Sequence, residues 1–367
     1  MNRAYKFRIY PNAAQQELLE KTFGCCRFIY NKMLEDKIHE YQEHGKMKRT
    51  TPAMYKKEFP FLKEVDSLAL ANVQLHLEKA YKAFFQNPKI GFPKFKSKHT
   101  SRRSYTTNCV NGNIRIMERN LRLPKLKDVK IILHRNIPEN YRLKSVTISK
   151  EPTGKYYASL LFDVSVCENQ AAKKTTEELK VLGIDFAMHG MAVLSNGECC
   201  EYPGYYKQAQ EKLAKEQRRL SRCQKGSANY NKQKKKVALC HEKVKNQRKD
   251  FHHKLSHRIA EEYDAVAVEN LNMKGLSQSL HLGKGVMDNG YGMFRTMLEY
   301  KLEERGKAYV QINRFFPSTK TCSVCGKIKG SMPLSERTYI CSCGNVMDRD
   351  VNAAINLREE AKRLLCA

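Results

Sequence analysis

Four cysteines crowd into 22 residues near the C-terminal end of this 367-residue chain. Cys322 and Cys325 form a CxxC pair, Cys341 and Cys343 form a CxC pair after fifteen intervening residues, and a glycine directly follows each pair. Two such knuckles present four thiolates tetrahedrally, which is the geometry of a structural zinc site. The spacing therefore predicts a zinc ribbon that holds one Zn²⁺ ion.

The remaining cysteines do not suggest a disulfide framework. The chain has thirteen cysteines, an odd number scattered along the sequence. The N-terminal segment alternates like a strand without an apolar signal-peptide core, and no apolar run approaches the roughly 18 residues of a membrane span. We expect a cytoplasmic protein, in a compartment that keeps thiols reduced.

The charge of the chain indicates a polyanionic partner. Lys and Arg number 67 against 38 Asp and Glu, and the formal charge of +29 opposes compaction unless a polyanion neutralises it. Binding to a membrane surface would need a hydrophobic anchor or a basic amphipathic helix with a bulky aromatic face, and the sequence has neither. Nucleic acid is therefore the expected partner, and a membrane is not.

The N-terminal half predicts one strand, then helices, then a group of short strands. Tyr5, Phe7 and Ile9 alternate with polar residues as in a strand, and Asn12 with Gln15 forms the pattern of a helix capping box. From about residue 91 to 165, segments punctuated by Gly and Pro alternate like short antiparallel strands. This pattern predicts a small β-barrel or sandwich.

The C-terminal half predicts an α/β domain. Strands with a hairpin at Asn196-Gly197 open it, and the apolar run that ends at Glu269 is typical of a buried parallel strand. Between them, residues 207–258 form a polar helical stretch with 17 Lys or Arg and 4 Asp or Glu. Such a stretch is either a solvated helix pair or a surface that tracks phosphates. The candidate phosphate contacts in it are Lys234, Lys235 and Lys236.

Three carboxylates occupy positions that an α/β sheet can bring to one cleft. Asp185 lies in the first strand of the C-terminal half, Glu269 ends another strand, and Asp350 begins the last helix. Any one of them alone is most simply a cap or a surface residue. Acids inside apolar strands are nevertheless costly unless cations compensate them, and two Mg²⁺ ions about 4 Å apart would do so.

Several segments, in this order and spacing, resemble the C-terminal half of TnpB proteins, the transposon-encoded relatives of type V CRISPR effectors. They are GIDFAMHGMAVLSNG, the basic helical stretch, VAVENLNMKG, FFPSTKTCSVCG and CSCGNVMDRDVNAAINL. The segment YKFRIYPNAAQQELLEKTFGCCRFIYN is similar to the opening of the family, so that the resemblance covers most of the chain.

The resemblance implies a multidomain fold in which α/β and β-barrel parts are each interrupted by an insert. A RuvC domain of the RNase H-like class would carry the zinc ribbon, and a wedge-type β-barrel would carry a helical recognition insert. The implied ranges are 1–10 and 91–170 for the barrel, 11–90 for its insert, 178–316 and 346–367 for the RuvC domain, 206–262 for a basic helical hairpin within it, and 317–345 for the ribbon.

The resemblance also assigns roles to the acids. In TnpB proteins the first Asp, the strand Glu and the Asp of the DxNAA motif are the RuvC catalytic carboxylates, which correspond here to Asp185, Glu269 and Asp350. Asp348 competes for the third role, and we prefer Asp350 because it directly precedes Val-Asn-Ala-Ala. Arg349 is a candidate contact to the scissile phosphate, with a surface arginine or a structural salt bridge as the alternatives.

The implied function is that of an RNA-guided DNA endonuclease of a transposable element. It would cut double-stranded target DNA beside a short flanking motif by two-metal hydrolysis with Mg²⁺, guided by RNA transcribed from the transposon end. The resemblance also implies a bacterial protein that associates with the nucleoid when it is bound to DNA, and the sequence identifies no protein partner. Two other classes stay open: a guide-directed DNA-binding repressor, which should lack one of the carboxylates, and a guide-free RNase H-like nuclease for structured DNA, which would not need the basic N-terminal half.

Overall fold

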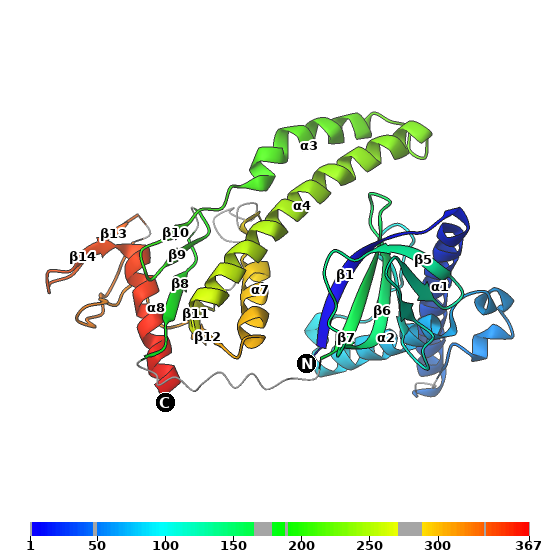
Figure 1. The fold of residues 1–367 in the computed structure, drawn as a ribbon, viewed down its shortest axis with the longest axis horizontal. Helices are drawn as coiled ribbons and strands as arrows, with labels where there is room; N and C mark the ends of the chain where they lie inside the picture. The colour runs from blue at the N-terminus through cyan, green and yellow to red at the C-terminus, as the bar shows by residue number, and fades with distance from the viewer. Residues whose placement is uncertain are drawn as a thin grey trace. The chain divides into compact units, whose positions relative to one another are not determined.

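The computed structural model describes residues 2–46, 50–164, 178–187, 190–270, 288–333 and 335–366. The chain divides into two compact units, Met1–Cys167 (unit 1) and Glu168–Ala367 (unit 2) (Figure 1). No helix in the described ranges combines the length and the apolar character that crossing a bilayer requires. Residues 165–170 of the expected barrel, and residues 188–189 and 271–275 of the quoted motifs, lie outside the described residues.

Unit 1 consists of a sheet and two long helices joined by short 3-10 turns. In chain order its described elements are β1 (Asn2–Tyr10), α1 (Ala13–His44), η1 (Met54–Lys56), η2 (Pro60–Lys63), α2 (Ser67–Gln86), η3 (Pro88–Ile90), β2 (Arg103–Asn108), β3 (Arg115–Ile116), β4 (Asn120–Leu123), β5 (Lys127–Ile132), β6 (Arg142–Lys150) and β7 (Tyr156–Asp163).

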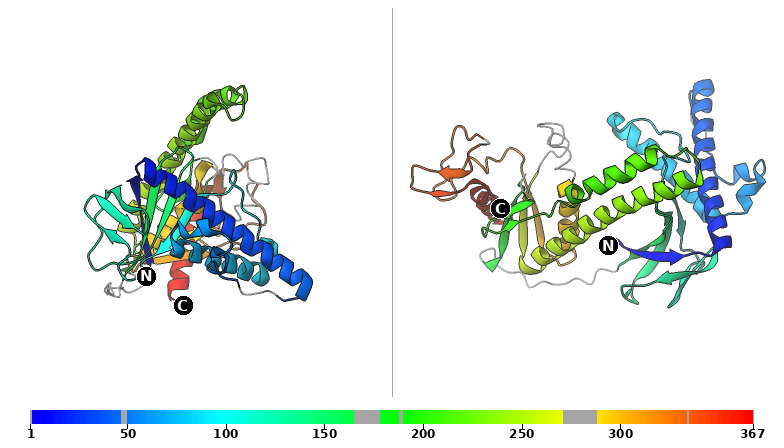
Figure 2. Two further views of the ribbon diagram at one scale, coloured as in Figure 1. Left: turned by 90° about the vertical axis from the view of Figure 1, so that its right-hand side faces the viewer. Right: turned by 90° about the horizontal axis from the view of Figure 1, so that it is seen from above.

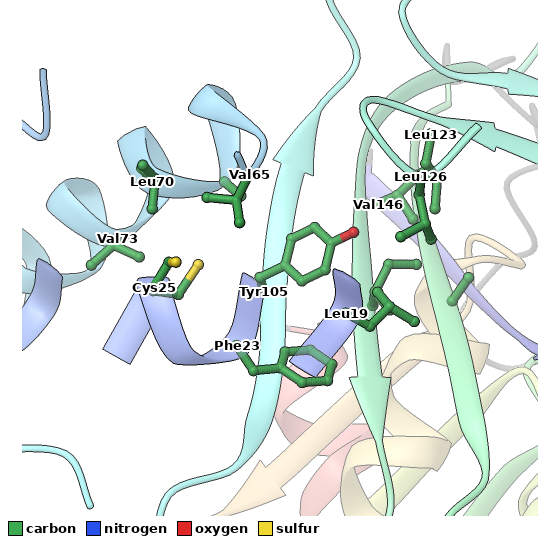
Figure 3. Close-up of a cluster of buried hydrophobic side chains, with 14 of the residues drawn as sticks. Leu19, Phe23, Cys25, Val65, Leu70, Val73, Tyr105, Leu123, Leu126 and Val146 are labelled. Carbon is green, nitrogen blue, oxygen red and sulfur yellow. The ribbon is translucent and has the colours of Figure 1, made fainter. Parts of the chain in front are cut away.

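Local sequence signals fix the start of α1 and its buried side. The Asn12 side chain accepts a hydrogen bond from the Gln15 backbone at 2.9 Å, and the Gln15 side chain accepts one from the Asn12 backbone at 3.0 Å. The predicted capping box is therefore present. Leu19 and Phe23 of α1 lie in one buried cluster with Tyr105 of β2, as Figure 3 shows. The helices thus share a hydrophobic core with the sheet.

The sheet of unit 1 does not close into a barrel. Its described strands pair in the order β2-β6-β7-β1-β5-β4-β3, every pair antiparallel, and β2 and β3 form the two edges. The prediction of a wedge-type β-barrel is therefore not confirmed. The physical reason is that α1 and α2 pack against β2. These helices cover the apolar face of the sheet near this edge, so the sheet does not need to close by strand pairing.

Unit 2 consists of an α/β sheet, a helical hairpin and a small two-stranded ribbon. Its described elements are β8 (Val181–Asp185), β9 (Ala192–Leu194), β10 (Cys199–Cys200), α3 (Tyr205–Ser221), α4 (Ala228–Glu262), β11 (Ala265–Glu269), α7 (Tyr291–Glu303), β12 (Ala308–Ile312), β13 (Thr338–Ile340), β14 (Val346–Asp348) and α8 (Arg349–Cys366).

The main sheet of unit 2 has the order β10-β9-β8-β11-β12. Strands β8, β11 and β12 run parallel, while β9 and β10 are antiparallel neighbours on one side. The predicted hairpin joins β9 to β10, with the Gly197 amide donating to the Leu194 carbonyl at 2.9 Å. Side chains of α4 and α7 bury one face of the sheet, and α8 buries the opposite face (Figures 1 and 2).

The predicted basic stretch forms two helices that pack against each other. Helix α3 ends at Ser221, and Ser227 caps the start of α4 by accepting a hydrogen bond from the Tyr230 amide at 3.1 Å. The C-terminal part of α4 contributes Leu255 and Ile259 to the core beneath the sheet. The hairpin is therefore anchored at one end, and its remaining surface is rich in Lys and Arg.

Candidate active site and metal centre

Two of the three predicted carboxylates end neighbouring parallel strands. In the register of β8 and β11, Val181 pairs with Ala265 and Ile184 with Val268, which brings Asp185 opposite Glu269. Side chains alternate between the two faces of a strand. The core residues Val181 and Ala265 face α8, and the same parity places Asp185 and Glu269 on that face.

Helix α8 brings the third carboxylate to the same edge. Asp350 lies in the first turn of α8, which packs along β8 and β11, and its side chain is 20% exposed. The charges of Glu269 and Asp350 both act on Asp185. The structure therefore brings the three predicted residues into one electrostatically coupled group.

The surroundings of Asp185 and Glu269 oppose the negative charge of their carboxylates. Burial first, and then the charges of Glu269 and Asp350, raise the pKa of Asp185 to about 8 against an opposing effect of Arg349. Burial also raises the pKa of Glu269. A divalent cation would relieve this repulsion, and carboxylate oxygens are the donors that Mg²⁺ prefers. The donor set therefore fits magnesium.

Asp348, the competitor for the third role, has a structural function. Its Oδ1 atom accepts hydrogen bonds from the amides of Asp350 at 2.8 Å and Val351 at 3.1 Å. These contacts make Asp348 the N-terminal cap of α8, which satisfies two amides that the helix itself leaves unpaired. The capping role favours Asp350 as the acid that faces the site.

Arg349 is largely buried and its guanidinium is already engaged. The Nε atom donates to Asp350 Oδ1 at 3.2 Å, and Nη1 donates to the Glu336 carbonyl at 2.9 Å. With a side chain only 9% exposed, Arg349 positions Asp350 and ties α8 to the segment before β13. This arrangement favours the structural salt bridge, and its contact with a phosphate stays a prediction. Lys234, Lys235 and Lys236 are exposed near the start of α4, and their contact with nucleic acid also stays a prediction.

The four predicted cysteines converge on one point. Their sulfur atoms all lie within 4.8 Å of one another. Cys322 Sγ lies 3.7 Å from Cys343 Sγ, and Cys325 Sγ lies 3.6 Å from Cys341 Sγ. These distances exceed a disulfide bond of about 2.05 Å. They match the edge of about 3.8 Å in a tetrahedron of sulfurs, each about 2.3 Å from a zinc ion.

Backbone amides and glycines build the two knuckles. The Gly326 amide donates to the Cys322 carbonyl at 2.9 Å, and the Gly344 amide donates to the Cys341 carbonyl at 3.0 Å. Both glycines have positive φ, 74° and 90°, a conformation that side chains with a Cβ rarely adopt. This explains why a glycine directly follows each cysteine pair.

The ionisation of the thiols also calls for a cation. Burial raises the pKa of Cys322, but hydrogen bonds from the backbone amides of Cys325 and Val324 outweigh this effect. They lower the pKa of Cys322 to about 6. The Asn345 amide lowers the pKa of Cys343, but the neighbouring thiols and burial have a larger opposite effect. The pKa of Cys343 is therefore raised to about 12. Four thiolates so close together are stable only around a positive ion, so the cluster fits a structural zinc site.

Two asparagines that the sequence analysis did not single out connect the metal centre to the carboxylates. Asn352 of α8 donates to the Thr321 carbonyl at 2.7 Å and accepts from the Ser323 amide at 3.0 Å, and Asn356 donates to the Thr321 carbonyl at 2.7 Å. Their spacing of four residues on one helix was the available signal. They hold the first cysteine knuckle against the helix that carries Asp350.

Comparisons with protein families match three parts of the chain. Residues 164–280 match the family described as "Probable transposase" (OrfB_IS605), and residues 291–357 match the Cas12f1-like TNB domain. Residues 1–46 match a model described as a helix-turn-helix domain, although this structure forms β1 and the single helix α1 there.

Similar proteins cover almost the whole chain. One is named "Putative RNA-guided DNA endonuclease", from Streptomyces pristinaespiralis, and is 35% identical over 97% of this chain and 89% of its own length. A second, "Putative RNA-guided DNA endonuclease InsQ" from Escherichia coli (strain K12), is 28% identical over 97% of this chain and 91% of its own length. The solved structure of Cas12f1 with sgRNA and target DNA shares the fold, with a TM-score of 0.60 at 12% identity over 98% of each chain. With such identity along nearly its full length, the chain belongs to the TnpB family.

Proposed function

We propose that this protein is an RNA-guided DNA endonuclease of a transposable element, which cuts target DNA with Mg²⁺ at Asp185, Glu269 and Asp350. The observation that supports the proposal is that Asp185 and Glu269 end neighbouring parallel strands and that the charges of Glu269 and Asp350 both act on Asp185. The names of two relatives, each aligned with 97% of the chain, support the same activity. Because all three carboxylates are present, cleavage is favoured over guide-directed repression without cleavage.

In this proposal the chain contributes ligands and their positions, while the bound Mg²⁺ would activate a water and stabilise the leaving 3′ oxygen. Asp185 and Glu269 supply oxygens from a rigid pair of strands, and Asp350 supplies a third from the capped first turn of α8. Arg349 and Arg337 keep Asp350 in place, with an Nη1–Oδ2 distance of 3.7 Å for Arg337.

We further propose that the guide is RNA transcribed from the transposon end and that base pairing, not the protein, selects the target strand. The protein itself would read a short motif that flanks the target. The net charge of +29 supports stable binding of RNA together with DNA. Residues 206–262 would contribute a basic surface to this binding, because α3 and α4 expose Lys and Arg over most of their length.

A plasmid-depletion experiment tests the proposal. The chain is expressed with its native flanking DNA, the RNA that copurifies is sequenced, and cells are challenged with a plasmid library that carries randomised bases beside the guide-matched target. The proposal predicts a discrete bound RNA and selective loss of plasmids that share one short flanking motif. The parallel Asp185→Ala strain should retain the RNA and lose no plasmid. Loss of no library member with the unaltered chain would count against nuclease activity.

A further inference from the structure

One stretch of unit 1 is strongly cationic and contains no acid. The 39 residues from 79 to 117 contain nine Lys or Arg and no Asp or Glu. They comprise the end of α2, η3, the segment before β2, β2 itself and β3. Arg103 pairs with Glu20 of α1 at 3.6 Å, and the stretch itself offers no acid to its other cations. Charge of one sign over such a length favours the binding of an anion.

The same stretch displays phenylalanines on the surface. Phe85 is 60% exposed, Phe95 is 58% exposed and Phe92 is 43% exposed. The ring of Phe85 lies 6.2 Å from that of Tyr81, which in turn lies 5.5 Å from Phe92. Packing against their neighbours therefore holds Phe85 and Phe92 in place and leaves part of each ring uncovered. Exposed aromatic groups of this kind mark a binding surface.

A cavity of about 170 Å³ in the same unit is lined by cations. Arg27, Lys96 and Arg102 line it, and no acidic residue does. Phe23 and Tyr105, both labelled in Figure 3, also contribute to its wall. Among the described residues neither Arg27 nor Arg102 makes an ion pair or a hydrogen bond through its side chain. The cavity is therefore suited to an anion such as a phosphate group.

Lys96 joins the cavity to the aromatic stretch. Its backbone is fixed to α1 through Asn31, which accepts from the Lys96 amide at 2.8 Å and donates to the Lys96 carbonyl at 2.9 Å. The Lys96 Nζ atom lies 3.8 Å from the centroid of the Tyr30 ring. Burial lowers the pKa of Lys96. His76 also lines the cavity, and burial together with the charges of Lys96 and Lys79 lowers its pKa. The site is thus electropositive and preformed.

We propose that Phe85, Phe92 and Phe95, together with the cavity beside Lys96, bind a single-stranded segment of nucleic acid. Unpaired bases would stack on the exposed rings, and a backbone phosphate would enter the cavity. A duplex hides the faces of its bases from such rings, which favours a single strand. A second copy of this chain is disfavoured as the occupant, because the chain carries a net charge of +29 and the stretch has no acid to pair with it.

The inference rests on the proposed function only for the source of the strand, which would be either the guide RNA or an unpaired strand of the target DNA. Binding is measured without cleavage, so the two can fail separately. A chain that binds single strands through these residues and cuts nothing would keep the inference and remove the proposed function.

The test measures fluorescence anisotropy of the full-length chain with labelled oligouridylate, oligothymidylate and a duplex of equal length. The variants are Phe95→Ala, Phe95→Tyr, which keeps the ring, and Arg102→Gln. Tyr41→Ala is the matched control, because Tyr41 is 59% exposed on α1 and lies outside the acid-free stretch. All four should retain the parental melting temperature, since the altered side chains are exposed.

Phe95→Ala should weaken binding of a single strand about tenfold, within the range for loss of one stacked base, and leave the salt dependence unchanged. Phe95→Tyr should bind a single strand with the parental affinity, because it keeps an aromatic ring. Arg102→Gln should instead reduce the slope of log affinity against log salt by about 0.7. A loss confined to the RNA points to the guide, and a loss confined to the DNA points to the target strand.

Three results would overturn the inference. The first is a Phe95→Ala variant that binds single strands as tightly as the Tyr41→Ala control. The second is an equal loss of affinity for the duplex, which would mean that the rings do not stack on bases. The third is self-association of the parental chain that Phe95→Ala abolishes while nucleic-acid binding stays the same.

Discussion

Gly183 lies two residues before Asp185, where α8 crosses β8. A Cβ atom at this position would lie 1.9 Å from the carbonyl oxygen of Ala354 and 2.7 Å from the amide nitrogen of Arg358. Both are backbone atoms of α8, so a change of rotamer cannot relieve the clash. An ordinary carbon–oxygen contact needs about 3.3 Å. Gly183→Ala must therefore separate the strand from the helix by about 1.4 Å.

That separation falls directly on the proposed active site, because Asp185 is on β8 and Asp350 is on the first turn of α8. Catalytic groups must be held to within about 0.5 Å, and a misplacement of about 1 Å can cost a hundredfold in rate. We expect Gly183→Ala to slow cleavage about a hundredfold. Overpacking should cost about 1–3 kcal/mol of stability, which leaves the protein folded.

The assay is single-turnover cleavage of a guide-matched target in Mg²⁺, alongside target binding and a thermal melt. Gly292→Ala is the matched control, because nothing lies within 4 Å of a Cβ at that exposed helical position. The control should cut at the parental rate. A Gly183→Ala variant that also cuts at the parental rate would refute the reasoning, since the close approach of α8 would then have no bearing on the site.

Three further predictions concern the metal centre, the basic hairpin and a buried histidine. Elemental analysis should find about one zinc per chain, and Cys322→Ser should lose the metal and loosen the ribbon, seen as faster proteolysis there. Neutralising Lys234, Lys235 and Lys236 together should reduce the slope of log affinity for duplex DNA against log salt concentration by about 0.9 per lost phosphate contact. An unchanged slope would mean that these lysines form a solvated surface without phosphate contacts. Burial, followed by the charge of Arg248, lowers the pKa of His252 to about 4. Between about pH 6.5 and 4 the unfolded chain therefore binds more protons than the folded chain at this histidine. Its contribution to the free energy of unfolding is fully present above this window and is lost as the pH decreases through it. Urea titrations should show unit 2 about 2 kcal/mol less stable at pH 5 than at pH 8 through this histidine, and His252→Gln should remove that part of the dependence.

The sequence was sufficient wherever a local pattern decides the structure. The capping box of Asn12 and Gln15, the hairpin at Asn196-Gly197 and the convergence of the paired cysteines all depend on residues close together in the chain. The apolar run before Glu269 also forms the buried parallel strand that its composition predicts. In each case short-range geometry leaves little room for another outcome.

The sequence did not predict features that depend on contacts between residues far apart in the chain. Strand β1 pairs with β5 and β7, which lie 120 or more residues away in the chain. The alternation of residues 91–165 does not show that helices cover β2 and leave the sheet open. Gly183 looks like any glycine in an apolar strand until α8 is placed against it. The capping role of Asp348 likewise emerges only from its contacts with the amides of α8.

The paired acids at the start of α8 give the most direct test of the claim that Asp185, Glu269 and Asp350 cut DNA. Asn caps helices as well as Asp does, so Asp348→Asn removes the charge and keeps the cap. Cleavage and target binding are measured for Asp350→Asn and Asp348→Asn in Mg²⁺, with Asp185→Asn and Glu269→Gln beside them. We expect Asp350→Asn, Asp185→Asn and Glu269→Gln each to lose at least about a hundredfold in cleavage rate, a loss of several kcal/mol in transition-state stabilisation, and to retain target binding. Asp348→Asn should cut normally. If Asp348→Asn abolishes cleavage and Asp350→Asn does not, the third ligand is Asp348, and if all four variants cut at the parental rate, the proposed active site is wrong.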